Sequence, residues 1–161
     1  MRLSKKGVYA LRVLRLLAED FGRNPISATT LAEQEGISVK YLEQVLAILR
    51  KRGILVSERG KTGGYSLRVP PDKITLGDII RATDGPLAPI PCASRTAPHE
   101  DPDCPYPFDT CWLRHLMRRV RDNISAILDQ ETLAQMTLDA KGAVRKQEFT
   151  ARRNSKGKHK E

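Results

Sequence analysis

Three cysteines within a short stretch are the residues whose types and spacing point most directly to chemistry. Cys92, Cys104 and Cys111 are separated by eleven and six residues. Thiolates are soft ligands that suit iron–sulfur clusters and zinc. An odd number of clustered cysteines is also more typical of a metal, cluster or redox site than of a disulfide framework. The sequence therefore predicts a metal, cluster or redox site here.

The cysteines lie in, and at the end of, a proline-rich segment. Residues 86–109 contain seven prolines and show little periodicity, which predicts a loop that is ordered only if something ties it down. Cys111 stands at the start of a predicted helix, where backbone N–H groups and the helix dipole favour a negatively charged sulfur. A bound metal or cluster accounts for such a loop better than three buried apolar side chains.

A long helix is expected after the loop, over about residues 111–129, with Asp109 or Thr110 as its N-cap. Its other face carries Arg114 and Arg121 among several charged residues. Its apolar positions alternate four and three apart, as in a coiled-coil seam, and they are Leu113, Met117, Val120, Ile124 and Ile127. The simplest partner for this seam is the same helix of a second subunit, so we expect a homodimer. Packing on its own domain alone is the alternative.

Helical signals divide the first part of the chain into short elements. A first helix is expected over residues 4–19, and a second starts after Ser27 or Thr30 and ends at Gly36. A longer helix follows Ser38, and its apolar residues form a core-facing stripe of Leu42, Val45, Leu46 and Leu49. A short helix, a glycine turn and a longer helix with one polar face is the helix-turn-helix arrangement.

A β-hairpin is expected after the third helix. Residues 54–56 are apolar, residues 65–69 alternate, and the turn between them is basic and rich in glycine. Glycines allow the backbone of such a tip to approach another surface closely. One more helix is expected from Thr75 to Asp84, followed by a short terminal helix after Thr132.

The third helix and the hairpin predict a surface that reads double-stranded DNA. Such a helix fits the major groove, where its polar side chains reach base edges and phosphates. Gln44 can pair with adenine and Glu43 can accept a hydrogen bond from cytosine, whereas Lys40 and Arg50 can contact phosphates. The alternative for Glu43 is an ion pair with a nearby Lys or Arg on the helix surface. The expected DNA contacts are Ser38, Lys40, Tyr41, Glu43, Gln44, Arg50, Arg59, Lys61 and Thr62.

Composition and charge bound the remaining possibilities. The 161 residues carry a net charge of +9, but residues 141–161 hold eight Lys or Arg against two Glu, so the basic character belongs mainly to the tail. Such a tail binds nucleic acid non-specifically or is a solvated, disordered end. The sequence shows no apolar run of membrane-spanning length and no secretory signal, which predicts a cytoplasmic protein. It shows no nucleophile triad and no phosphate-binding loop, so no enzyme is expected.

Four segments together resemble a known family. They are residues 3–12, the helix from Ser38 to Arg50, the hairpin tip from Arg59 to Tyr65, and residues 74–80. Over about residues 1–130 the chain resembles the Rrf-two-type family of winged helix-turn-helix transcriptional regulators, which includes IscR-, NsrR- and RirA-like members. The resemblance implies a homodimer, usually a repressor, that binds a pseudo-palindromic operator.

The resemblance also implies that the three cysteines hold an iron–sulfur cluster, with the 2Fe-2S form favoured over 4Fe-4S. Family members take a fourth ligand from a His three residues past the last cysteine, or from the partner's first helix. The matching positions here are Arg114, Val8 and Arg12, which cannot serve, and the first gap between cysteines is unusually long. His115, one turn from Cys111, is the first substitute, ahead of His99, Glu100, Asp101, Asp103 and Asp109.

The expected fold is mainly α with a small β-hairpin wing: a winged helix-turn-helix domain plus a long dimerisation helix. The expected divisions are a DNA-binding domain (1–85), a cysteine-containing loop (86–110), a dimerisation helix with a short terminal helix (111–138) and a basic, disordered tail (139–161). The expected function is a DNA-binding regulator whose operator affinity responds, through the cluster, to iron–sulfur or iron status, redox state or nitric oxide. The alternative is a winged-helix regulator with a structural zinc or a thiol redox switch.

Overall fold

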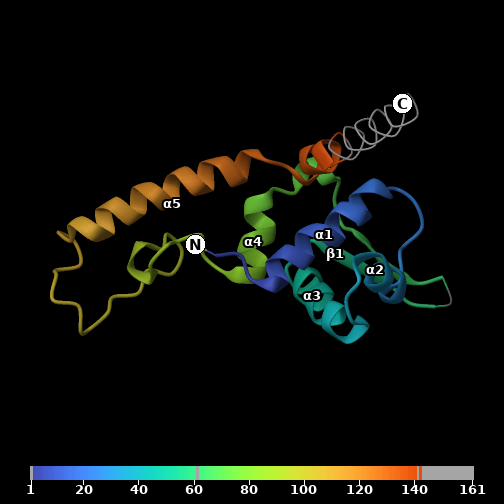
Figure 1. Cartoon of the computed structure of the whole chain (residues 1–161), viewed down its shortest axis with the longest axis horizontal. Helices are drawn as coiled ribbons and strands as arrows, with labels where there is room; N and C mark the ends of the chain where they lie inside the picture. The colour runs from blue at the N-terminus through green and yellow to red at the C-terminus, as the bar shows by residue number, and fades with distance from the viewer. Residues whose placement is uncertain (1, 61, 141, 143–161) are drawn as a thin grey trace, which may run out of the picture.

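Four helices and a two-stranded wing form the N-terminal part of the protein. The computed structural model describes residues 2–60, 62–140 and 142. The long helix α5 (Trp112–Gln130) runs away from this part of the molecule (Figure 1). The expected fold, mainly α with a hairpin wing, is confirmed. The other elements are α1 (Lys5–Glu19), α2 (Ala28–Glu35), α3 (Val39–Lys51), β1 (Leu55–Glu58), β2 (Gly64–Leu67) and α4 (Leu76–Asp84).

Each of the first four helices begins at a hydroxyl side chain that accepts a backbone hydrogen bond, which satisfies a free N–H group of the first turn. The caps expected at Ser38 and Thr75 are confirmed, and Ser27 rather than Thr30 starts α2. Gly36 ends α2 with a φ of 65°, in the left-handed region that glycine adopts without strain. The turn between α2 and α3 is thus set by local residues.

The core forms where α1, α2 and α3 meet the wing and α4. Leu42, Val45, Leu46 and Leu49 are fully buried, which confirms the predicted core-facing stripe of α3. Burying a Leu side chain contributes about 1.5–3 kcal/mol. The stripe therefore stabilises α3 strongly enough to leave the opposite face free for polar residues.

The wing is fastened to the segment that precedes α2. Strands β1 and β2 pair antiparallel, with Leu55 opposite Leu67. Ile26 and Tyr65 exchange backbone hydrogen bonds of 3.0 and 2.8 Å. A Cβ atom added at Gly64 would lie 2.5 Å from the backbone carbon and oxygen of Ile26. Only glycine lets these two backbones come so close.

Gly64→Ala is expected to lower the free energy of unfolding by about 1–3 kcal/mol, the usual cost of an overpacked contact. The added methyl group fits only if the Ile26 backbone moves away from β2. Urea unfolding followed by circular dichroism measures the change. Gly142→Ala is the control, because no atom of the described residues lies within 4 Å of a Cβ atom there. Equal unfolding midpoints for the two variants would contradict the prediction.

The start of α5 differs from the expectation. The predicted N-cap at Asp109 or Thr110 is wrong, because Cys111 occupies the N-cap position and makes no side-chain hydrogen bond there. The Asp109 carbonyl oxygen lies 2.9 Å from Nε2 of His115, and its carboxylate lies 4.0 Å from Arg114. Asp109 therefore contacts side chains of the first turns rather than the free N–H groups.

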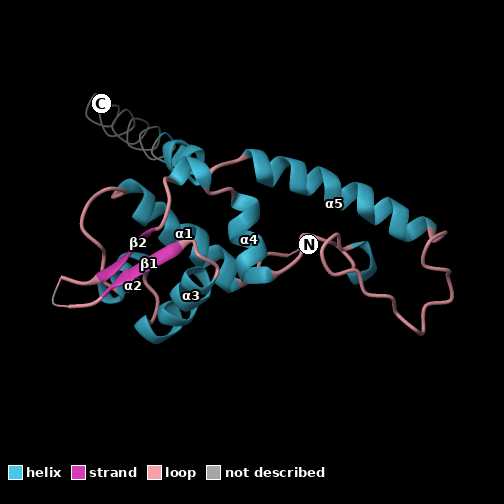
Figure 2. Cartoon of the chain, turned by 180° about the vertical axis from the view of Figure 1, so that it is seen from behind, coloured by secondary structure: helices cyan, strands magenta, loops and turns pink. Residues whose placement is uncertain are grey.

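After α5 the chain returns to the N-terminal domain. Thr132 forms a bridge with Thr75, and the N–H of Leu133 donates to the carbonyl of Ile74 at 2.8 Å. Residues 133–140 are helical, which confirms the expected short terminal helix. Figure 2 shows residues 133–140 beside one end of α4, close to the C-terminal end of α5. The loop that leads into α5 lies at the N-terminal end of α5.

The basic tail expected over residues 139–161 lies mostly outside the described residues, and residues 139 and 140 belong to the terminal helix. Within the described ranges, no helix has both the length and the apolar character that a membrane crossing needs.

Candidate DNA-reading surface and cysteine site

The polar face of α3 is presented to solvent. Lys40, Glu43, Gln44 and Arg50 are all exposed, as the predicted DNA contacts require. Arg50 also donates to the hydroxyl of Ser57 at 3.3 Å, which links the end of α3 to β1. The reading helix and the wing are thus joined by a side-chain contact as well as by the short chain between them.

Two residues expected at the DNA surface have structural contacts of their own. Ser38 Oγ accepts the backbone N–H of Tyr41 at 3.3 Å, as the N-cap of α3. Tyr41 is half-buried, and its ring stands edge-on to the ring of Tyr9, with centroids 5.8 Å apart. Ser38 therefore fixes the start of α3, and Tyr41 positions α3 against α1, whatever contact they make with DNA.

Glu35, at the end of α2, is a buried carboxylate that the sequence pattern did not single out. Its side chain is only 5% exposed and pairs with Arg12 at 2.5 Å and with Arg15 at 3.9 Å. Arg12 also donates to the Glu35 carbonyl at 3.2 Å and lies over the ring of Tyr9. Helix α1 thereby fixes the end of α2 and the turn into α3. The opposite charges on α1 and α2 can be read from the sequence, but the sequence does not show that the Glu35 carboxylate is buried between the two helices.

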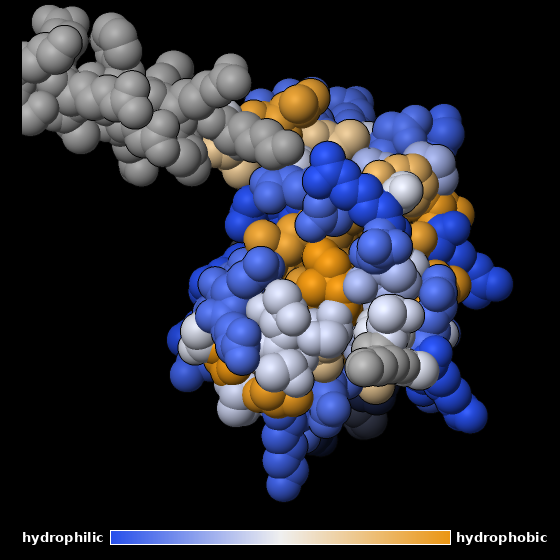
Figure 3. Space-filling model, turned by 90° about the vertical axis from the view of Figure 1, so that its right-hand side faces the viewer, coloured by the Kyte–Doolittle hydropathy of each residue, from blue (hydrophilic) through white to orange (hydrophobic). Residues whose placement is uncertain are grey.

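The wing tip is polar and tightly turned. Arg59 and Thr62 are exposed, and the N–H of Gly63 donates to the carbonyl of Gly60 at 3.0 Å. Lys61 lies outside the described residues. Seen from the wing end of the molecule, charged and polar side chains surround a smaller group of apolar residues (Figure 3). The exposed polar residues at this end, which include Arg59 and Thr62, suit contact with phosphates.

The three cysteines line a single small pocket. Cys92 lies in a short 3-10 helix, Cys104 in the middle of the loop, and Cys111 at the N-cap of α5. All three are free thiols; Cys111 is buried and Cys104 is exposed. The pocket has a volume of about 40 Å³, and Glu100 and Asp101 also line it. The fold thus brings the three predicted residues to one place and adds two carboxylates.

Arg114 fastens both ends of the cysteine loop to α5. Its Nε donates to the carbonyl of Cys92 at 3.0 Å, and its Nη1 donates to the carbonyl of Phe108 at 3.2 Å. The guanidinium also lies 3.7 Å from the centre of the Phe108 ring, a cation–π contact. The side chain is 12% exposed, so the charged face that was expected opposite the apolar seam is partly covered by the loop at this position.

Arg121, two turns further along α5, makes a second attachment. It is 7% exposed, donates to the carbonyl of Ala93 at 2.6 Å and pairs with Asp122 at 2.5 Å. The loop therefore also covers the charged face of α5 at this position. Buried carbonyl groups need hydrogen-bond donors, and the extended loop offers its own backbone few of them. The spacing of seven between Arg114 and Arg121 was the available sequence signal.

The cysteine site fits a metal or cluster by residue type. Three thiols and two carboxylates are suitable ligands for iron or zinc. Within the described part of the chain, however, no three His, Cys, Asp or Glu side chains lie close enough together to hold a metal ion. Binding of a metal or cluster therefore requires the side chains that line this pocket to come closer together. His115 does not line the pocket and instead faces the Asp109 carbonyl.

A winged reading domain, a long helix and a three-cysteine loop together invite comparison with known proteins. Residues 3–139 match the family Rrf2, described as "Iron-dependent Transcriptional regulator". The chain belongs to the Rrf2 family. The resemblance inferred from the four sequence segments is therefore confirmed.

Rrf2-family relatives of two kinds resemble this chain. It is 37% identical over 133 residues to the HTH-type transcriptional regulator CymR of Bacillus subtilis, with 83% of this chain and 87% of the relative covered. The solved structure of CymR, "the Global Cysteine Regulator of B. subtilis", has a TM-score of 0.68 at 36% identity and covers 85% of this chain and 96% of that one. T. potens IscR has a TM-score of 0.68 at 35% identity, with 89% and 90% covered. The protein is a transcriptional regulator and not an enzyme.

Proposed function

We propose that this Rrf2-family protein is a homodimeric repressor whose affinity for a pseudo-palindromic operator is controlled by an iron–sulfur cluster. The observation that carries the proposal is the pocket shared by Cys92, Cys104 and Cys111 at the junction of the loop and α5. The iron-dependent description of the family and the likeness to IscR support iron at this site.

In the proposed complex, α3 lies in the major groove of each half-site. The exposed Gln44 and Glu43 face base edges, whereas Lys40 and Arg50 neutralise phosphates. Arg59 and its neighbours Lys61 and Thr62 on the wing contact the adjacent backbone or minor groove. Two copies of α3 related by a two-fold axis then read two half-sites about one helical turn apart.

Control would pass from the cysteine loop to α5 through the two buried arginines. A bound cluster supplies iron that responds to iron supply, oxidation and nitric oxide. Arg114 holds the Cys92 carbonyl and Arg121 holds the Ala93 carbonyl, so a shift of Cys92 moves α5. The other end of α5 is fixed to α4, where the N–H of Leu76 donates to the Glu131 carbonyl at 2.9 Å. The angle of α5, and hence the distance between the two α3 helices, then sets operator affinity.

A second candidate is a regulator in which the cysteines bind structural zinc or act as a thiol redox switch. The redox-switch form of this candidate is favoured by the separation of the thiols, which form no metal-binding group within the described residues, and by the exposure of Cys104. The likeness to CymR, a cysteine regulator, is compatible with it. In this case oxidation or zinc loss, rather than cluster chemistry, changes the loop.

Anaerobic purification followed by visible absorption and by iron, sulfide and zinc analysis decides between the two candidates. The proposal predicts visible absorption, with iron and acid-labile sulfide in similar amounts. Operator binding by the holo and cluster-free proteins, measured over a range of salt concentrations, should then differ, because only one α5 angle matches the half-site spacing. Zinc without sulfide, a colourless metal-free protein, or equal affinity of the two forms would contradict the proposed control.

A further inference from the structure

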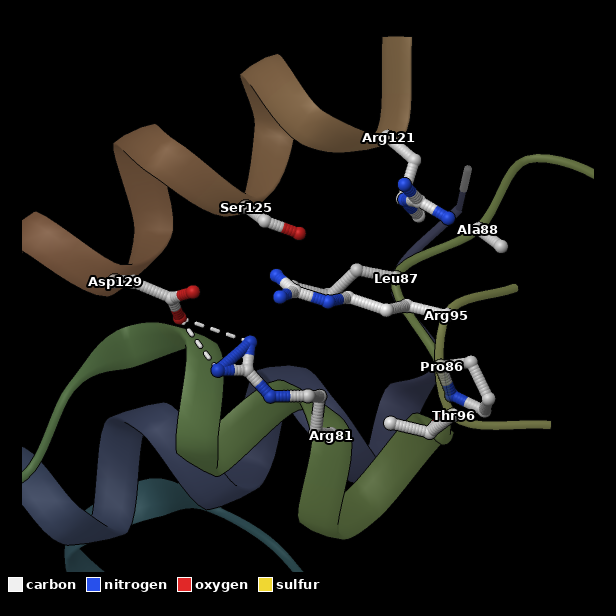
Figure 4. Close-up of a pocket in the computed structure, with 9 residues that line it drawn as sticks. All are labelled: Arg81, Pro86, Leu87, Ala88, Arg95, Thr96, Arg121, Ser125 and Asp129. Atoms are coloured by element: carbon white, nitrogen blue, oxygen red, sulfur yellow. Dashed lines mark hydrogen bonds and ion pairs between the residues drawn. The ribbon is translucent and has the colours of Figure 1, made fainter. Parts of the chain in front are cut away.

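A second cavity lies between α4, α5 and the segment that carries Cys92. Its volume is about 200 Å³. Guanidinium groups reach it from all three walls: Arg81 from α4, Arg121 from α5 and Arg95 from the loop (Figure 4). The side chains of Pro86 and Leu87 add an apolar wall. The cavity is separate from the cysteine pocket, with which it shares no lining residue.

Two of the three guanidinium groups already have partners. Arg81 donates twice to one carboxylate oxygen of Asp129, at 2.8 and 2.5 Å. Arg121 is paired with Asp122 and with the Ala93 carbonyl. Asp129 is the only acid that lines the cavity in the described part of the chain. The lining therefore carries more positive than negative charge.

Arg95 has no hydrogen bond or ion pair with any described residue. Figure 4 shows its guanidinium extended into the cavity, between Ser125 of α5 and Arg81 of α4. A free guanidinium group with a hydroxyl beside it suits the oxygen atoms of carboxylates, phosphates and sulfates, which arginine binds through paired N–H groups. An anion bound in the cavity would supply Arg95 with the negatively charged partner that it lacks among the described residues.

The volume of the cavity suits a small molecule. A cavity of about 150 Å³ accommodates benzene, so 200 Å³ holds an inorganic oxyanion or a short organic acid rather than a nucleotide. The apolar wall of Pro86 and Leu87 offers a place for a few carbon atoms.

We propose that this cavity binds a small oxyanion, held by Arg95 and Arg81 with Ser125, and that the anion is an effector of DNA binding. The Arg81–Asp129 pair ties α4 to the last turn of α5. A Cβ atom at Gly77 would collide with both of these side chains, so that glycine leaves the space in which they meet. An anion on Arg95 and Arg81 draws the loop toward α4 and shares Arg81 with Asp129. The site thus acts on the same α4–α5 junction as the proposed control, and the coupling between anion and operator is reciprocal.

Isothermal titration of the full-length protein with inorganic phosphate, sulfate and succinate tests the site. The wild type is expected to bind at least one of them saturably, with one anion per chain. The Arg95→Gln protein should bind that anion about 10- to 100-fold more weakly, since a hydrogen bond to a charged group is lost. Preference for succinate indicates a carboxylate ligand, and preference for phosphate or sulfate indicates an inorganic or esterified oxyanion.

Arg119→Gln is the matched control, because Arg119 is exposed on α5, does not line the cavity and carries the same charge. Its affinity for the anion should equal that of the wild type. Absence of saturable binding, or an equal loss in the two variants, would overturn the proposal by showing that general positive charge accounts for any binding. The titration needs neither DNA nor a cluster, so its result is independent of the proposed cluster control. Operator affinity measured with and without the bound anion tests the effector role, and equal affinities would overturn it.

Discussion

The Leu116→Glu/Val120→Glu protein is expected to be monomeric and to bind the operator about 10²–10⁴-fold more weakly than the unchanged protein, because linked half-site binding is lost. Both side chains belong to an exposed apolar stripe on α5 in which Leu116 is 43%, Val120 36% and Ile127 64% exposed. In a two-fold dimer each glutamate would be buried against its own copy or an apolar neighbour, which strongly disfavours association.

Sedimentation velocity measures the oligomeric state, and fluorescence anisotropy with an operator duplex measures affinity. Arg118→Glu is the control: it changes the net charge by the same amount, is exposed and points away from the stripe at about 100° per residue. It should remain dimeric. A double variant that stays dimeric would show that another surface joins the subunits.

The DNA-reading half of the molecule could be predicted because its signals are local. The N-caps Ser38 and Thr75, the left-handed Gly36 and the stripe from Leu42 to Leu49 each act within a turn or two of helix. Their spacing is fixed by helix geometry, so no knowledge of distant contacts is needed.

The directions of Arg114 and Arg121 could not be predicted in the same way. A charged residue on an amphipathic helix normally faces solvent, and here both guanidinium groups are turned inward by the carbonyls of Cys92 and Ala93. Those partners lie more than twenty positions away in an irregular loop whose path the sequence pattern does not give. The buried Glu35 was missed for a related reason, since its partner Arg12 lies on another helix.

The cysteine site is an intermediate case. The residue types and the loop predicted that Cys92, Cys104 and Cys111 belong together, and they do line one pocket. The helical spacing that favoured His115 places it one turn from Cys111, but its ring contacts the Asp109 carbonyl, outside the pocket. Proximity along a helix thus identified a neighbour of the cysteine, whereas the path of the loop decides which acids face the thiols.

Cys104→Ala is expected to reduce bound iron and sulfide to background levels. Cys104 is the only thiol supplied by the middle of the loop, and without it the remaining two sulfurs cannot complete a cysteine-based cluster site. Because Cys104 is exposed, its replacement should change the free energy of unfolding of the cluster-free protein by no more than about 0.5 kcal/mol. Loss of the cluster, with equal unfolding midpoints for the cluster-free wild type and variant, would therefore separate ligation from folding.

The fourth ligand can be located with two further variants in the same spectroscopic measurement. The Glu100→Gln/Asp101→Asn protein is expected to shift the visible spectrum and lose iron faster to a chelator, since both carboxylates line the cysteine pocket and the amides are poorer ligands. His115→Ala is the comparison and should keep the original spectrum. A changed spectrum in His115→Ala, with none in the double variant, would mean that the loop closes so as to bring the first turn of α5, rather than the acidic segment, to the iron.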